Sequence, residues 1–259
     1  MSALQIIEGR EIVQKLYKSV IEKPMPASME SEIISNSSTI TEIPAYRDGS
    51  RKIPNSTQHN VPAWTLFAMF FVVISLGGSI VREKQSGSFI RLKTLPTNYS
   101  IAMISKQVTY LFITLLQVFV IFSMGIWLFP LIGLPRLTLP SDLLGLFIVS
   151  VLCGWSAISY AMCIGVLAHT QEQANGFGAV SIVILSAIGG ILVPSFAMPE
   201  SFEFVMKLSP LHWCLESYYV LFLEQGKFSD LLTSVIPLMI FIIVVQCIAW
   251  YSLKRKNLI

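Results

Sequence analysis

A short charged cluster is the part of this sequence best suited to bind another molecule. Arg82, Glu83 and Lys84 follow one another directly after residues 61–81, a run without a single charge. Side chains of both signs can form ion pairs with a partner, and such pairs fix orientation more than they add affinity. Gly87, close behind, has no Cβ that would hold a partner away. The cluster is therefore a candidate docking site, although a basic membrane anchor would have the same residues.

The residues after Gly87 have the pattern of a short amphipathic helix. Phe89, Leu92 and Leu95 repeat every three residues, Arg91 adds a basic face, and Pro96 ends the helix. A helix of this kind lies parallel to a membrane and either rests on lipid or docks in the groove of a partner. The pattern alone leaves both interpretations open, because a basic anchor beside a membrane would look the same.

The sequence gives no sign of chemistry of its own. It contains no GxxxxGK[ST], HExxH or GxSxG motif, and no pair of acids inside an apolar run. Carriers driven by protons or sodium keep acids or histidines within their spans, so neither such a carrier nor an intramembrane enzyme is favoured. The four cysteines show no CxxC spacing. We expect no catalytic, cofactor-binding or metal-binding residues, and any energy must come from a partner.

The docking cluster is positioned by long apolar segments. Of 259 residues, 54% are apolar and 13% are charged, whereas about a quarter of the residues of a soluble domain are charged. Five runs are long enough to cross a bilayer as helices: 61–81, about 108–130, about 143–168, about 177–196 and about 232–252. The sequence therefore predicts an all-α integral membrane protein with five transmembrane helices and an amphipathic cytoplasmic helix.

The segment 208–223 is too short to be a sixth span, and it contains Glu216. A charge at the centre of a membrane helix costs roughly 2.5–3.5 kcal/mol on insertion scales. We expect a helix that lies at the outer interface or re-enters the membrane from it.

The basic residues predict the orientation. The loop 82–107 and the tail around Lys254 and Arg255 are basic, and cytoplasmic segments carry an excess of Lys and Arg. The C-terminus is then cytoplasmic, and the loops 131–142 and 197–231 lie outside. Residues 1–60 also fall outside as a small polar segment without a hydrophobic segment before it. This predicts an extracytoplasmic remnant that lacks an upstream spanning helix, whereas the inverted topology would place both basic clusters outside.

Residues 61–256 resemble the type 2 ATP-binding-cassette (ABC-2) exporter permeases. The family signature E-[RK]-x-x-G-[ST]-x-x-x-L-x-x-x-P is matched by Glu83, Lys84, Gly87, Ser88, Leu92 and Pro96. The stretch from Ser209 to Trp213, with the apolar residues that follow as far as Gly226, resembles the outer segment before the last span of that family. Family members have six spans, so the expected lack of the first span is the main departure of this sequence from the family. A second departure is Ser88, since threonine is more common at this position of the signature.

The resemblance implies a permease in the plasma membrane, the inner membrane of a bacterium. It implies a second permease half, as a homodimer or heterodimer, and two separate ATPase subunits that bind the ATP; nucleic acid has no part. The helix after the first apolar run would dock on the ATPase through Arg82, Glu83, Lys84, Gly87, Phe89, Arg91, Leu92, Leu95 and Pro96. The substrate would be a hydrophobic or amphipathic drug, lipid or glycoconjugate. The alternative is a membrane subunit that transmits force from such an ATPase and carries no substrate.

Overall fold

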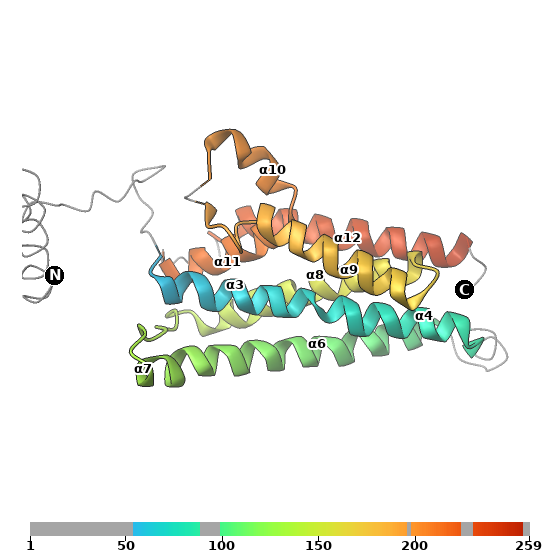
Figure 1. Ribbon diagram of the computed structural model, residues 1–259, viewed down its shortest axis with the longest axis horizontal. Helices are drawn as coiled ribbons and strands as arrows, with labels where there is room; N and C mark the ends of the chain where they lie inside the picture. The colour runs from blue at the N-terminus through green and yellow to red at the C-terminus, as the bar shows by residue number, and fades with distance from the viewer. Residues whose placement is uncertain (1–53, 89–98, 196–197, 224–229, 256–259) are drawn as a thin grey trace, which may run out of the picture. The chain divides into compact units, whose positions relative to one another are not determined.

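The computed structural model describes residues 54–88, 99–195, 198–223 and 230–255 (Figure 1). Residues 46–259 form one compact unit, distinct from residues 1–45. Within the described residues every regular element is a helix and no strand occurs, which confirms the all-α class. The predicted outer segment, residues 1–60, lies almost entirely outside the described residues.

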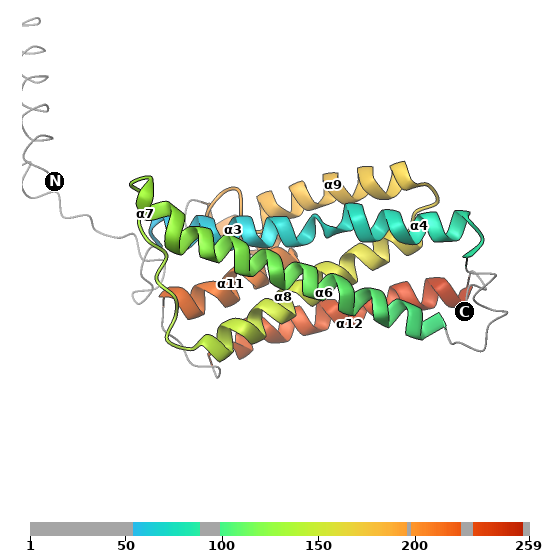
Figure 2. The same cartoon turned by 90° about the horizontal axis from the view of Figure 1, so that it is seen from below.

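The first membrane helix is longer than the predicted span 61–81. It consists of α3 (Ser56–Phe70), a π-helical turn (Val73–Gly77) and α4 (Gly78–Gln85), which run end to end in both views (Figures 1 and 2). The helix begins at Ser56 because Asn55 and Gln58 form a capping box: the Asn55 carboxamide accepts from the Gln58 N–H at 2.7 Å, and the Asn55 N–H donates to the Gln58 side chain at 3.1 Å. The helix therefore begins five residues before the predicted span.

Three further helices are long and apolar enough to cross a membrane, which makes four among the described residues. The second is α6 (Tyr99–Ser123), continued by a π-helical turn (Met124–Leu128) and α7 (Phe129–Leu131). The others are α8 (Leu143–Leu167) and α12 (Leu232–Arg255). The helix α6 begins nine residues before the predicted span 108–130, so part of the basic loop 82–107 is helical.

The helix α9 (Gln171–Ile188) occupies the place of the predicted span 177–196. It starts earlier because the Thr170 hydroxyl accepts from the Gln173 N–H at 3.1 Å and so caps the helix. It also ends earlier, before the turn at Gly189 and Gly190. Its first turns are polar, and α9 is not among the four helices that qualify as spans by length and composition. The structure therefore does not confirm the five-span count.

The segment before the last span folds as two short helical pieces, Glu200–Phe202 and α10 (Glu203–Lys207), followed by α11 (Pro210–Leu223). A helix lying flat on an interface exposes one face, whereas α11 is buried nearly all round against α3, α8, α9 and α12. The exposed apolar side chains instead belong to the preceding residues, with Phe204 74% and Leu208 67% exposed. The arrangement of α11 is therefore not that of a helix lying flat on the interface.

The first membrane helix packs against α6, α8, α9 and α11. Its side chains Leu66, Met69 and Phe70 are fully buried in the main core, together with Tyr218 of α11. The end of α4, the start of α6, the turn between α8 and α9, and the end of α12 lie at one end of these packed helices, and the start of α3 and α7 lie at the other (Figures 1 and 2). The residues of the docking cluster thus sit at the end that also carries Lys254 and Arg255.

Candidate functional site

The charged cluster that follows the first apolar run is part of the helix itself. Arg82, Glu83 and Lys84 lie in α4, which ends at Gln85, where the Ser86 N–H donates to the Arg82 carbonyl at 2.9 Å. The resemblance implied that Arg82, Glu83 and Lys84 belong to a docking helix that follows the first apolar run. Its first residues instead continue the membrane helix, because no proline or glycine interrupts the chain between Gly78 and Gly87.

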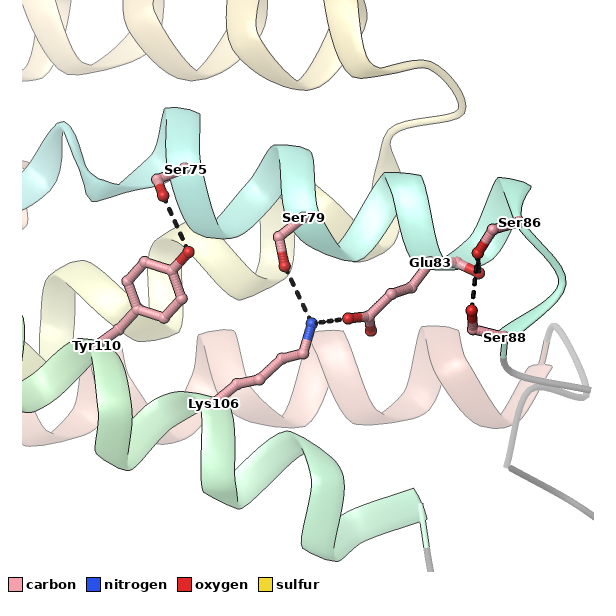
Figure 3. A network of polar contacts seen from close by, with 7 residues as sticks. All are labelled: Ser75, Ser79, Glu83, Ser86, Ser88, Lys106 and Tyr110. Carbon is pink, nitrogen blue, oxygen red and sulfur yellow. Dashed lines mark hydrogen bonds and ion pairs between the residues drawn. The ribbon is translucent and has the colours of Figure 1, made fainter. Parts of the chain in front are cut away.

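Glu83 is bound to the start of α6. Its carboxylate forms an ion pair with Lys106, whose ammonium also donates to the Ser79 hydroxyl at 3.0 Å (Figure 3). Ser79 lies one helical turn before Glu83, so both face the same side of α4. The two charged side chains are 23% and 34% exposed, which leaves the pair partly screened from water.

Lys84 binds the other neighbour of α4. Its ammonium donates to the carbonyls of Gly165, Val166 and Ala168, at 2.7, 3.0 and 2.5 Å. These carbonyls lie at or just beyond the C-terminal end of α8, where carbonyls have no partner inside the helix and the helix dipole favours a cation. Lys84 therefore caps α8 from a different helix.

A close crossing of α8 and the π-helical turn before α4 makes this cap possible. A Cβ added at Gly165 would lie 2.9 Å from the Gly77 Cα and 2.9 Å from the Gly77 carbonyl oxygen. Only glycine allows the backbones to approach so closely. The crossing lies about two helical turns before Lys84, so the end of α4 stays beside the end of α8.

Gly87 forms the turn that ends the helix. It has φ 70°, a conformation that favours glycine because it has no Cβ. A Cβ at Gly87 would meet nothing within 4 Å, so the residue is required for the path of the chain and not for space. The Ser86 hydroxyl, which donates to the Glu83 carbonyl at 3.2 Å and pairs with the Ser88 hydroxyl at 2.8 Å, completes the turn (Figure 3).

The nine predicted site residues are thus divided. The structure brings Arg82, Glu83, Lys84 and Gly87 together at the end of the first helix. The other five, Phe89, Arg91, Leu92, Leu95 and Pro96, lie outside the described residues, so the amphipathic helix stays a prediction. Among the described residues no cluster of three or more His, Cys, Asp or Glu side chains could hold a metal ion.

A polar contact inside the bundle was missed by sequence reasoning. The carboxamides of Gln107 on α6 and Gln246 on α12 donate to each other at 3.3 and 3.2 Å, and Gln246 also donates to the Ser159 hydroxyl of α8 at 3.0 Å. This contact ties three helices together. The sequence holds a signal at Gln246, which interrupts an otherwise apolar run, but none at Gln107, which directly follows Ser105 and Lys106.

The fold and the site define a multi-pass membrane protein with a charged end. The sequence model of the ABC-2 family transporter proteins matches residues 1–251, and the chain belongs to that family. It is 22% identical over 187 residues to the "Probable multidrug ABC transporter permease YbhR" of Escherichia coli (strain K12), and equally to that of Escherichia coli O157:H7. These matches cover 71% of this chain and 49% of each relative, so the chain spans about half the length of the curated relatives it matches.

Proposed function

We propose that the chain is the permease subunit of an ABC exporter and that a separate ABC ATPase supplies the energy. The observation that carries the proposal is the match to the ABC-2 family over residues 1–251. The structure supports it with a membrane helix that continues without a break into the charged cluster at Arg82–Lys84. An ATPase that pulls or pushes on the loop after this cluster would act directly on the helix packed against four others.

In the proposed orientation, the end of the bundle that carries Arg82, Lys84 and Lys106 lies in the cytoplasm. Lys254 and Arg255 of α12 lie at this same end (Figures 1 and 2). Cytoplasmic segments carry the excess of Lys and Arg, so the proposed topology has the C-terminus inside and the N-terminal segment outside. The membrane is the plasma membrane, which in a bacterium is the inner one.

The proposal includes α9 as a fifth span. The helices α8 and α12 both end at the proposed cytoplasmic end, so the chain has to cross back between them, and α9 runs in that return direction (Figure 2). Its 18 residues correspond to about 27 Å, close to the thickness of a hydrocarbon core. The helix α11 would then be a re-entrant helix within the outer half of the bundle.

The proposed complex contains a second permease half and two ATPase subunits. The proposed substrate is hydrophobic or amphipathic, a drug, a lipid or a glycoconjugate. Two observations support this class: the relatives named above are described as multidrug permeases, and the described surface is rich in exposed apolar side chains, such as Phe112 at 69% and Phe119 at 70%.

Reconstitution tests the proposal. The tagged chain is purified from its own membranes with the ABC ATPase that binds it, and vanadate-sensitive ATP hydrolysis and ATP-driven movement of a lipophilic dye or a fluorescent phospholipid are measured in vesicles. We expect hydrolysis stimulated by the chain together with movement of at least one probe, and no ATP binding by the chain alone. Saturable ATP binding by the isolated chain, or an ATPase indifferent to the chain, would contradict the proposal. Stimulation without movement of any probe would favour the force-transmitting subunit.

A further inference from the structure

We infer that Glu83 and Lys84 are positioning residues that connect the loop after Gly87 to two different parts of the bundle, and that neither serves as a docking contact for the ATPase. The inference rests on the proposed function, since it says how a movement of that loop would spread. It changes the role that the sequence motif suggested for both residues, because their side chains bind helices of the same chain.

The contacts of Lys84 use its full donor capacity. An ammonium has three protons, and the carbonyls of Gly165, Val166 and Ala168 accept at 2.7, 3.0 and 2.5 Å. A partner could recruit this ammonium only by taking it from the end of α8, which would leave those carbonyls without their donor. Gln85 strengthens the same connection, since its side-chain amide donates to the His169 carbonyl at 3.1 Å.

Glu83 makes the equivalent connection to α6. Consecutive residues of a helix point about 100° apart, so Glu83 and Lys84 reach different neighbours from the same turn of α4. Glu83 and Ser79 hold the Lys106 ammonium on the α6 side (Figure 3), and Lys84 holds the turn between α8 and α9 on the other.

This arrangement gives two separate routes by which a movement of the loop can reach the bundle, called here the two outputs. A displacement of the loop would reach α6 through Glu83 and Lys106, and it would reach the α8–α9 turn through Lys84. The Gly77–Gly165 crossing holds the end of α8 against the first helix about two helical turns before Lys84, so Lys84 determines whether the last two turns of α4 also move with the end of α8. Docking on the ATPase would then fall to residues beyond Gly87.

Spin labels on the full chain in nanodiscs can separate the two outputs. One label is placed on Ser86 and the second on exposed Glu172 of α9 or on exposed Ser105 of α6. The background has the four native cysteines replaced: Cys153, Cys163, Cys214 and Cys247. The measurement is the width of each distance distribution by electron paramagnetic resonance.

We expect each substitution to loosen one connection only. Lys84→Met should widen the distribution of distances between labels at positions 86 and 172, and leave the distribution between positions 86 and 105 narrow. Lys106→Met should widen the 86–105 distribution and leave the 86–172 distribution narrow. Lys84→Arg keeps the charge and should keep 86–172 narrow, and Lys84→Gln serves as a second neutral variant if Lys84→Met does not fold. The matched control is Lys207→Met on α10, whose exposed ion pair with Glu203 has no part in either connection.

The complex with the ATPase supplies the second readout. Lys84→Met should leave the affinity for the ATPase unchanged and lower the amount of probe moved per ATP hydrolysed. If neither neutral variant widens the 86–172 distribution, or if Lys84→Met weakens ATPase binding without widening it, the inference is wrong. A wild-type chain that never stimulates an ATPase would contradict the proposed function instead, and the spin-label result would stand by itself.

Discussion

The first membrane helix and the one that follows it are both strongly apolar, yet they occupy opposite places in the bundle. In its most apolar 18-residue stretch, the helix Ser56–Gln85 is 61% buried inside the chain, and Ile101–Leu131 is only 22% buried. The former carries Gly77 where it crosses α8, while the latter exposes large side chains such as Phe119 at 70% and Trp127 at 76%. The two helices are almost equally apolar, with mean hydropathy 2.1 and 2.3, so apolar content does not decide which of them lies in the centre.

The largest expected effect compares one phenylalanine from each helix. Phe70 of α3 is fully buried, whereas Phe119 of α6 is 70% exposed. We expect Phe70→Ala to lower the free energy of unfolding by about 3 kcal/mol, because it leaves a cavity, and Phe119→Ala to change it by less than about 0.5 kcal/mol. Reversible unfolding in mixed micelles with rising SDS measures both. Equal losses for the two variants would show that burial does not distinguish the helices.

A smaller effect is expected where the π-helical turn before α4 crosses α8. A methyl group at Gly165 would lie 2.9 Å from backbone atoms of Gly77, and a backbone cannot move aside as a flexible side chain can. We expect Gly165→Ala to destabilise the chain by roughly 1–3 kcal/mol through overpacking. Gly176 of α9 is the control, because a Cβ there meets nothing within 4 Å. Gly176→Ala should be neutral or stabilising in the same unfolding assay, and a harmless Gly165→Ala would contradict the close crossing.

The smallest effect concerns the carboxamide contact between α6, α8 and α12. Gln246→Leu removes the bonds to Gln107 and Ser159, and we expect a loss of roughly 1 kcal/mol, since hydrogen bonds between membrane helices contribute about that much. The neighbouring Cys247 is exposed on the same helix, so Cys247→Leu is the matched control and should be silent. A stabilising Gln246→Leu would mean that this contact does not hold the three helices together.

Most of the helical fold could be predicted from the sequence because hydropathy and length mark membrane helices strongly. The ends of the helices could not, because they depend on single side chains. Asn55 and Thr170 start helices before the apolar runs begin. A search for apolar runs does not detect such capping residues. The burial of α11 also escaped prediction, since Glu216 in a short apolar segment is compatible with either an interface or a buried helix.

The docking role of the candidate site stays a prediction, but the structure shows contacts of Glu83 and Lys84 that the sequence did not reveal. In the sequence, Glu83 and Lys84 were interpreted as charged side chains that form ion pairs with a partner. Their actual neighbours, Lys106 and the end of α8, lie more than 20 residues away in the chain. The packing of α4 against α6 and α8 brings these residues into contact. A local sequence pattern cannot predict a contact between residues so far apart in the chain.

The central claim is that the loop after α4 carries the energy of the ATPase into the bundle, and two glycines test it most directly. Gly87 and Gly133 have φ 70° and 78°, and a Cβ at either would meet nothing within 4 Å. Leucine at either position is strained by the backbone alone, but Gly87 lies at the proposed cytoplasmic end and Gly133 follows α7 at the opposite end.

The measurement is stimulation of the partner ATPase in reconstituted vesicles, at matched amounts of each permease variant. The account predicts that Gly87→Leu loses most of the stimulation and that Gly133→Leu keeps it. Full stimulation with Gly87→Leu, or an equal loss with both variants, would contradict the role of this loop.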